Sequence, residues 1–469
     1  MTTSLPRPGD WSFDAELLRR HGVNGPRYTS YPSALQFNED FGPAQFAEQA
    51  RLSNVGQYSR QLSLYVHVPF CASPCFYCGC NRVITRSPVA GERYVDFLER
   101  EIARVGALFE PGREVVQLHF GGGTPNFLDG PQLARVVACL RQHFHFSQAQ
   151  DRDISIELDP RTTTPAHVAA LAEAGFTRAS LGVQDLSVEV QEAINRVQSF
   201  EQTYAVVAAC RAYGLRSINL DLVYGLPYQT LEGFAETLDR TLALRPDRLA
   251  VYGYAHMPSV FKAQRQIPED ALPDAEGRLA LLELAVQRLR AAGYDYIGLD
   301  HFALPGDALA QALRTGSLHR NFMGYTTHAQ TDLLGFGVSA ISHVGDSYSQ
   351  NHRDLRQWEA ALEQEHLPIM RGVLLDEDDT IRADVIQQLM CGGRVEPEQI
   401  ERAWSIRFQE YFRDEIHALA PLVQDGLVRV DPDLIEVTPR GRGLLRLVAM
   451  RFDRYLAGGH LRGRHSRAV

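Results

Sequence analysis

The sequence predicts an α/β fold in which six parallel βα units form an incomplete barrel. Six short runs rich in β-branched and aromatic residues recur between residues 62 and 254. Amphipathic stretches with a helical period separate them, which is the pattern of parallel βα units. A closed barrel of this type needs eight units, so six units leave one side open. The runs are "LSLYVHV" from residue 62, "VVQLHF" from 115, "ISIELD" from 154, "ASLGVQD" from 179, "INLDLVYG" from 218 and "RLAVYGY" from 248.

Different patterns flank this central domain, which is expected to span residues 46–374. Residues 1–45 are predicted to form an ordered arm, because Pro26 and Pro32 in "GPRYTSYPS" discourage a helix. Residues 375–469 are mostly helical in pattern, with two short strands expected at "DGLVRV" and "LIEVTP". Helix, two strands and helix resemble a winged-helix unit, which we interpret as a packing or lid domain.

Composition excludes several classes of function. The net charge is −10 and the lysines and arginines form no long runs, so nucleic-acid binding is not expected. No apolar run approaches the roughly 18 to 20 residues of a membrane-spanning helix, and the N-terminus has no secretory pattern. We therefore expect a cytoplasmic protein with reduced thiols and no membrane partner. No pattern predicts a large interface, and a monomer is expected.

The stretch "CASPCFYCGC" (71–80) contains four of the seven cysteines. Cys71, Cys75 and Cys78 have the spacing C-x3-C-x2-C, which supplies three thiolates to a [4Fe–4S] cluster and leaves one iron open for chemistry. The alternative is a structural zinc site with four cysteines. These four would be crowded around one ion, because zinc sites usually combine two C-x2-C pairs set well apart.

Polar residues follow the other predicted strands, where the carboxyl ends of a parallel barrel carry active sites. "GGGT" (121–124) follows the second run, Asp159 the third and Gln184 the fourth. Tyr224 and Ala255 follow the last two runs, and Glu157 lies within the third. Glycines in the "GGGT" loop allow the backbone to approach a ligand closely.

The cysteine loop, with Tyr77 before its third cysteine, resembles the signature of the radical S-adenosylmethionine (radical SAM) superfamily. The resemblance implies that the open iron binds SAM and that reductive cleavage gives a 5′-deoxyadenosyl radical. Together with "GPRYTSYPS", "YAHMPS", "LHRNFMGYTT" and "TDLLGFGVSAIS", the motifs resemble the oxygen-independent coproporphyrinogen III oxidases from about residue 25 to the C-terminus.

This resemblance implies the oxidative decarboxylation of two propionates of coproporphyrinogen III to vinyl groups, giving protoporphyrinogen IX in anaerobic heme biosynthesis. The alternative is a heme chaperone of the same superfamily, which binds and delivers heme. Such chaperones typically carry Phe at the place of Cys80 and lack the arm, so the oxidase is favoured. A flavodoxin- or ferredoxin-like electron donor is expected.

Site residues follow from the same resemblance. Two SAM molecules are implied per active site, with Cys71, Cys75 and Cys78 as cluster ligands. Cys80, Tyr65 and Glu157 are the expected catalytic residues, and we place Cys80 near the substrate. The first SAM site comprises Tyr65, Gly122, Glu157 and Ile341. The second comprises Tyr77, Gly123, Thr124, Gln184, Arg196, Asp221 and Ala255.

The substrate carries four carboxylates, so arginines must converge on it in this acidic protein. The candidates are Arg27, Arg82, Arg86 and Arg320. No histidines have metal-binding spacing, so His67, His119, His256 and His301 are expected in the core or behind the site. Cys139, Cys210 and Cys391 are expected to be small buried side chains.

Overall fold

A computed structural model describes residues 11–55 and 60–456. The six predicted strands are present and pair in chain order, each parallel to the next. They are β1 (Gln61–Val68), β4 (Glu114–Gly122), β6 (Asp153–Leu158), β7 (Arg178–Gln184), β8 (Ser217–Tyr224) and β9 (Arg248–Gly253). The predicted arrangement of six βα units is confirmed.

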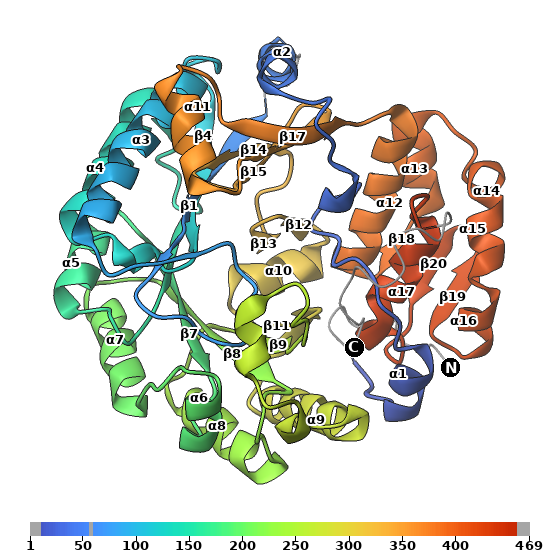
Figure 1. The fold of residues 1–469 in the computed structure, drawn as a ribbon. Coiled ribbons are helices and arrows are strands. Elements are labelled where there is room, and N and C mark those ends of the chain that lie inside the picture. The colour runs from blue at the N-terminus through green and yellow to red at the C-terminus, as the bar shows by residue number, and fades with distance from the viewer. Residues whose placement is uncertain (1–10, 56–59, 457–469) are drawn as a thin grey trace.

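Helices cover the outer face of these strands in an arc (Figure 1). Side chains of Asp129, Thr164, Ser199, Thr230 and Asp274 accept backbone N–H groups at the starts of five of them. The arc contains α3 (Pro88–Gly106), α4 (Gly130–His143), α5 (Pro165–Glu173), α6 (Val188–Ala193), α7 (Phe200–Ala212), α8 (Leu231–Ala243) and α9 (Ala275–Ala291).

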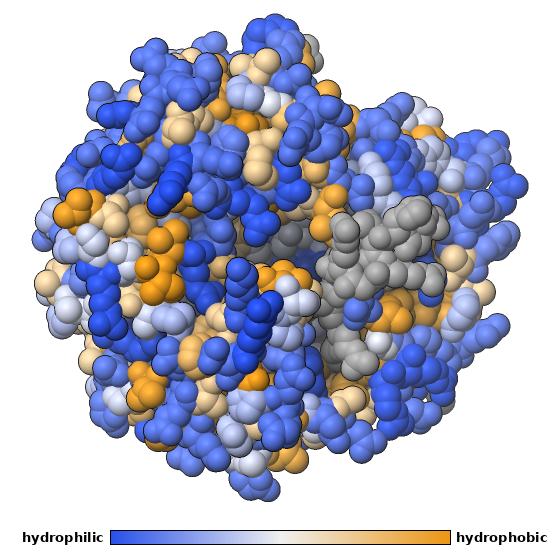
Figure 2. Space-filling view, viewed as in Figure 1, coloured by the Kyte–Doolittle hydropathy of each residue, from blue (hydrophilic) through white to orange (hydrophobic). Residues whose placement is uncertain are grey.

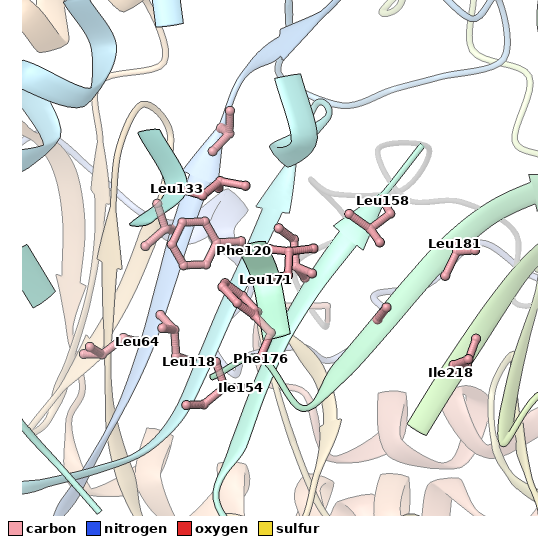
Figure 3. Close-up of a cluster of buried hydrophobic side chains, with 14 of the residues drawn as sticks. Leu64, Leu118, Phe120, Leu133, Ile154, Leu158, Leu171, Phe176, Leu181 and Ile218 are labelled. Atoms are coloured by element: carbon pink, nitrogen blue, oxygen red, sulfur yellow. The ribbon is translucent and has the colours of Figure 1, made fainter. Parts of the chain in front are cut away.

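A continuous hydrophobic core joins the helices to the strands. Leu133 of α4 and Leu171 of α5 are buried with Phe120 of β4 and Leu158 of β6 (Figure 3). Strands buried on both faces carry near-continuous apolar runs, as in other parallel sheets covered by helices. This packing fixes the carboxyl ends of the strands, from which the loops of the site emerge.

The sheet extends beyond the six strands at both ends, which the sequence reading did not predict. Beside β9 run the antiparallel strands β11 (His301–Ala303) and β10 (Asp295–Gly298). At the other end, β14 (Thr331–Phe336) is parallel to β1 and is followed by antiparallel β15 (Ile341–Val344), β16 (Ser347–Asn351) and β17 (Ile369–Leu374). Within residues 11–55 and 60–456 the two ends do not pair, so the barrel is open.

Short elements complete the central part of the chain. β2 (Phe70–Cys71) pairs with β3 (Val83–Ile84) on either side of the cysteine loop. β5 (His145–Phe146) pairs with β4, and β12 (His319–Asn321) forms a hairpin with β13 (Gly324–Thr326). The remaining helices are α10 (Ala308–Thr315) and α11 (Leu355–Glu363).

The C-terminal region is mostly helical, as predicted. Its strands β19 (Val428–Asp431) and β20 (Leu434–Val437) lie where two strands were expected, and β18 (Arg394–Val395) adds a third. Its helices are α12 (Glu377–Gly392), α13 (Pro397–Trp404), α14 (Phe408–Tyr411), α15 (Arg413–Ala418), α16 (Ala420–Gln424) and α17 (Leu445–Ala449). Residues 1–10 of the expected arm and 457–469 of the expected C-terminal domain lie outside the described residues.

The N-terminal arm runs along the seam between the barrel and the C-terminal helices (Figure 1). It contains α1 (Ala15–His21) and leads into α2 (Pro43–Asn54). Leu17, Leu18, Tyr28 and Tyr31 are buried in the core of the C-terminal region. The Tyr28 hydroxyl also donates to Asp453 at 3.0 Å. No described helix has the length and apolar character needed to cross a membrane.

Candidate active site

The four clustered cysteines line one large cleft at the carboxyl ends of the parallel strands. Its empty space is about 2030 Å³, including the part open to solvent. Figure 2 shows the same face hollowed in its middle. Cys71, Cys75, Cys78 and Cys80 are all free thiols. The predicted cluster ligands and Cys80 therefore face a common space.

Two arginine side chains that follow the cysteines in the sequence donate to backbone carbonyl oxygens of the cysteine loop and hold it in place. Arg82 donates to the carbonyl oxygens of Cys78 at 2.8 Å and Cys75 at 3.1 Å. Arg86 donates to that of Ala72 at 3.2 Å. Two of the candidate propionate-binding arginines thus support the loop backbone, although Arg82 also lines the cleft.

Each of the three predicted ligand sulfurs accepts a hydrogen bond. Thr124 Oγ1 donates to Cys71 Sγ at 3.4 Å, and the Cys80 backbone N–H donates to Cys78 Sγ at 3.4 Å. Arg161 and Arg196 each donate to Cys75 Sγ at 3.7 Å. Such donors stabilise thiolates, which are the form that binds metal.

The pKa values of the thiols follow from these surroundings. Burial raises the pKa of the Cys71 thiol. A hydrogen bond from Cys80 lowers the pKa of Cys78 to about 6, and the same bond raises that of Cys80. A thiol with the pKa of Cys78 is largely ionised at neutral pH, which is the form that binds metal.

This donor set fits a [4Fe–4S] cluster. Three thiolates on one short loop each bind a different iron, which spreads them more widely than ligands of a single ion. Among the described residues, no group of three or more Cys, His, Asp or Glu side chains is arranged to hold one metal ion. The arrangement gives no support to the zinc alternative.

Asp159 organises the charges behind Cys75. Arg196 donates to both carboxylate oxygens, at 3.2 and 3.3 Å, and Arg161 Nη2 donates at 2.6 Å. Burial acts to raise the pKa of Asp159, but the two guanidinium groups hold it below its usual value. Sequence reasoning missed Arg161, although its place two residues after Asp159 at a strand end was a usable signal.

Two further predicted carboxylates line the cleft. Glu157 Oε2 accepts the Gly122 N–H at 3.2 Å, and its other oxygen lies 3.5 Å from His119 Nε2. Asp221 accepts from Ser180 at 3.1 Å and from Asn219 at 2.8 Å. Burial, with the neighbouring charge of Glu157, raises the pKa of Asp221 to about 6. Ribose hydroxyls or an ammonium group are suitable ligands for carboxylates in such positions.

The backbone at the strand ends adopts conformations that ordinary residues avoid. Gly122 has φ +122°, and a Cβ on Gly123 would lie 2.6 Å from the Pro69 carbonyl oxygen. Gln184 has φ +69° at a register shift between β7 and β8. Such strain concentrates where a fold positions groups for function.

Two predicted residues are not among those that line the cleft. Tyr65 and Ile341 do not line the cleft, although Tyr65 stacks on His119 at 6.0 Å and its hydroxyl lies 3.1 Å from His67 Nδ1. The other predicted site residues do line it: Tyr77, Gly122, Gly123, Thr124, Glu157, Gln184, Arg196, Asp221 and Ala255.

Sequence reasoning missed the contacts that join the cysteine loop to the last strand. Gln264 donates to the Tyr77 carbonyl oxygen at 2.9 Å and to that of Ala255 at 3.2 Å. Tyr252 and Phe261 line the same cleft. Gln264 lies in the short 3-10 helix Lys262–Gln266 and Phe261 immediately precedes it, and this segment carries no motif that would indicate them.

The remaining candidates lie elsewhere. His67 is buried and contacts the Asn81 carbonyl oxygen at 3.0 Å, and His256 contacts Tyr254 and Glu269. Cys210 and Cys391 are buried as expected, whereas Cys139 is only partly buried. Arg27 and Arg320 lie together at the seam beside the arm.

The fold and the cysteine loop define a class of enzyme, and comparison with known proteins identifies the family. Residues 65–241 match the Radical SAM superfamily. The oxygen-independent coproporphyrinogen III oxidase of Escherichia coli K12 is 48% identical over 448 residues, covering 95% of this chain and 96% of that protein. The Pseudomonas aeruginosa enzyme of the same name is 47% identical, with coverages of 97% and 99%.

A solved structure agrees with the sequence relatives. The E. coli coproporphyrinogen III oxidase HemN, described as a radical SAM enzyme, superposes with a TM-score of 0.90 at 46% identity, covering 95% of this chain and 100% of that one. The chain belongs to the oxygen-independent coproporphyrinogen III oxidases, a family of radical SAM enzymes.

Proposed function

We propose that this enzyme converts coproporphyrinogen III to protoporphyrinogen IX without oxygen, by oxidative decarboxylation of two propionates to vinyl groups. The observation that carries this proposal is the near-full-length agreement with the named oxidases. The cleft is consistent with it, because the three cysteines and both SAM-type carboxylates line one space.

The cofactors are a [4Fe–4S] cluster and SAM. Cys71, Cys75 and Cys78 are the cluster ligands in this proposal, and their hydrogen-bond donors support that role. When bound, the pair supplies a carbon-centred radical that removes a hydrogen atom from the β-carbon of a propionate.

Two SAM sites are part of the proposal. Tyr65, Gly122, Glu157 and Ile341 belong to the first, and Tyr77, Gly123, Thr124, Gln184, Arg196, Asp221 and Ala255 to the second. Glu157 and Asp221 are separate carboxylates on the same cleft, which supports two sites. Equilibrium binding of SAM to the reconstituted enzyme tests the stoichiometry, and one SAM per cluster would refute it.

The protein's own residues bind, orient and shield in this reaction. A primary radical attacks almost any C–H bond, so placement and water exclusion outweigh acid–base catalysis. Glu157 and Asp221 orient SAM, while Arg161 and Arg196 fix the charge of Asp159 behind Cys75. Tyr65 supports the site from β1 through its contact with His67.

Cys80 acts near the substrate in this proposal, since three ligands already serve the cluster. The hydrogen bond to Cys78 raises the pKa of the Cys80 thiol, so this thiol is protonated at neutral pH. A Cys80→Ser variant is expected to retain its cluster but to lose turnover. Turnover equal to that of the wild type would exclude the role.

The wider setting is also proposed. A flavodoxin- or ferredoxin-like protein reduces the cluster, and the chain works as a cytoplasmic monomer with residues 375–469 as a packing domain. Sedimentation of the reconstituted enzyme tests the monomer, and reduction by purified flavodoxin or ferredoxin tests the donor.

An anaerobic single-turnover assay tests the reaction itself. Reconstituted protein, reductant, SAM and coproporphyrinogen III are mixed, and the porphyrins and 5′-deoxyadenosine are quantified. Tri- and dicarboxylic products alongside deoxyadenosine are expected. SAM cleavage with intact substrate, even with an electron acceptor present, would refute the proposal and favour the heme chaperone, which a heme titration then tests.

A further inference from the structure

Arg320 on β12 is a buried cation with no counter-ion among residues 11–55 and 60–456. Its residue is 5% exposed, its Nε donates to the Arg27 carbonyl oxygen at 3.3 Å, and its guanidinium lies 4.7 Å from the centre of the Tyr325 ring. Its Nη1 is buried and has no hydrogen-bond partner. Arg320 forms no ion pair in the described part of the chain.

Arg27 and His301 complete the group around it. Arg27 in the arm pairs with Asp300, lies 5.9 Å from the centre of the Tyr252 ring and keeps 37% of its side chain exposed. His301 Nδ1 is buried without a partner, and its ring contacts those of Tyr252 and Tyr325 at 5.9 and 5.4 Å. Arg27 comes from the arm, Arg320 from β12 and His301 from β11.

The charges in this group do not balance. Among the described residues, the guanidinium groups of Arg27 and Arg320 share one carboxylate, that of Asp300, and only Arg27 pairs with it. Burial and the nearby arginines lower the pKa of Arg27 to about 10 and that of His301 to about 3. His301 is therefore neutral at physiological pH, and the excess charge belongs to the arginines.

Buried charges in proteins are normally paired, because an uncompensated one is costly. The Arg320 guanidinium and the His301 ring both lie against the Tyr325 ring, and each can donate an N–H to a carboxylate oxygen when Nδ1 of the neutral His301 carries the proton. The group that would complete this site is therefore an anion with the shape and charge of a carboxylate.

The position of the group relates it to the cleft. Tyr252 lines the large cleft, whereas neither Arg27 nor Arg320 does. Arg27 and His301 both contact the Tyr252 ring, so the group borders the cleft at that ring, and Arg27 keeps part of its side chain exposed. A carboxylate bound there is separated from the radical chemistry by that aromatic ring.

We propose that Arg320, with Arg27 and the Nδ1 of His301, binds a propionate carboxylate that the product retains. This rests on the proposed function, in which two of four propionates remain in protoporphyrinogen IX. The retained group anchors the macrocycle while the other propionates are presented to the cleft. Arg82 and Arg86, which hold the cysteine loop, are not required for this contact.

Binding of stable oxidised porphyrins to the reconstituted protein tests the assignment without turnover. Coproporphyrin III carries all four propionates, and protoporphyrin IX carries only the two retained ones. Arg320→Gln is expected to weaken both about 10- to 100-fold, the loss that follows from removing a charge-assisted hydrogen bond. Weaker binding of coproporphyrin alone would assign Arg320 to a reacting propionate and overturn the proposal, as would unchanged binding of both.

Three further variants separate binding from folding. Arg320→Lys keeps the charge and is expected to restore part of the affinity, and Arg27→Gln, at a more exposed position, is expected to weaken both porphyrins. Arg248→Gln removes a buried guanidinium that is paired with Asp307 at 2.8 Å, and its porphyrin affinities are expected to equal those of the wild type. Equal losses of porphyrin affinity in Arg248→Gln and Arg320→Gln would show that removing either buried guanidinium only disturbs folding, and would overturn the proposal.

Turnover measurements distinguish a failure of the Arg320 binding site from a failure of the proposed decarboxylation. Arg320→Gln is expected to raise the KM for coproporphyrinogen III while iron content and substrate-free SAM cleavage stay unchanged. If the wild type binds both porphyrins through Arg320 but never decarboxylates, the proposed function fails and the binding site stands. If the wild type decarboxylates and Arg320→Gln has the same KM, the site fails and the function stands.

Discussion

Two buried charged side chains, Glu101 behind the sheet and Arg320 at its open side, have opposite surroundings. Glu101 on α3 accepts hydrogen bonds from Gly337 N at 2.7 Å, Asn351 Nδ2 at 2.6 Å and Trp358 Nε1 at 3.2 Å. Arg320 is buried almost as completely, yet one of its nitrogens has no partner.

The difference distinguishes a buried polar group that stabilises the fold from one that is available to bind a ligand. The Glu101 carboxylate ties α3, α11 and the β14–β15 turn together, and its hydrogen bonds are complete within the protein. Arg320, beside the open side of the sheet, keeps one nitrogen open for a group that the described residues do not supply. Substitutions behind the sheet should therefore change stability, while those on the cleft side should change binding and turnover.

The largest effect is expected at the cysteine loop. Cys75→Ala removes a proposed ligand of the cluster and should reduce turnover to background, because no radical can then be generated. In the metal-free form, the variant should unfold within about 1 kcal/mol of the metal-free wild type, because Cys75 is buried but only a single sulfur atom is removed. Iron content, turnover and urea unfolding are measured together.

Cys210→Ala is the matched control. Cys210 is fully buried on α7, away from the loop, so the variant should keep its iron and turnover while losing about 1 kcal/mol of stability. Full turnover in Cys75→Ala, or loss of iron in Cys210→Ala, would contradict the expectation that substitutions at the cleft change turnover and those behind the sheet change stability.

The next largest effect is expected behind the sheet. Glu101→Ala leaves the Gly337 N–H and the Trp358 indole N–H without an acceptor, while Asn351 still donates to the Gly337 carbonyl oxygen, so it should cost about 2–6 kcal/mol of unfolding free energy at roughly 1–3 kcal/mol per donor. The folded fraction should keep the wild-type KM for the porphyrinogen. Glu201→Ala, in the first turn of α7, should stay within about 0.5 kcal/mol. A large rise in KM for Glu101→Ala would contradict the purely structural role of Glu101.

The six parallel strands were predictable because their apolar runs are long and separated by amphipathic helices. The added edge strands were not. β16 (Ser347–Asn351) is fully buried, yet it consists of Ser, Tyr, Ser, Gln and Asn, so no hydrophobic run marks it. β10 and β11 are shorter still, and their pairing with β9 depends on tertiary packing rather than on local sequence.

The site was predictable where it follows strand ends, since the carboxyl ends of parallel strands meet at one edge. Glu157, Gln184 and Asp221 come from three such ends and line one cleft. Contacts between distant loops were not predictable. Arg27 and Arg320 are 293 residues apart in the sequence, and only the packing of the arm on β12 brings them together.

The pH dependence of stability tests whether the Glu101 site is purely structural. Burial raises the pKa of Glu101 to about 7 from an ordinary value of 4.5. Below pH 4.5 the carboxyl is protonated in both states, and between 4.5 and 7 only the folded protein keeps the proton. Stability should therefore fall as pH rises through this window, by up to about 3 kcal/mol, and level off above pH 7.

The contribution of Glu101 is isolated by subtracting the unfolding free energies of Glu101→Gln from those of the wild type at each pH. The difference should follow the stated slope, because glutamine does not titrate. A difference that stays flat from pH 4.5 to 7 would show that the three donors keep the carboxylate ionised.

The smallest effect is expected at the "GGGT" loop, where one substitution should change both stability and turnover. A Cβ at Gly123 would lie 2.6 Å from the Pro69 oxygen and 2.9 Å from the Phe70 oxygen, and both are backbone atoms that cannot move cheaply. Gly123→Ala should cost about 1–2 kcal/mol of stability. It should also reduce turnover, because the loop carries Thr124, the donor to Cys71.

Gly306→Ala is the control for this substitution. A Cβ at Gly306 meets no atom within 4 Å, so the variant should match or slightly exceed the wild type in stability, by less than about 1 kcal/mol. Urea unfolding and the electron paramagnetic resonance of the reduced cluster are compared for both variants. An unaltered cluster signal with full turnover in Gly123→Ala would mean that the loop adapts without moving Cys71, and the strand-end strain would then be structural rather than functional.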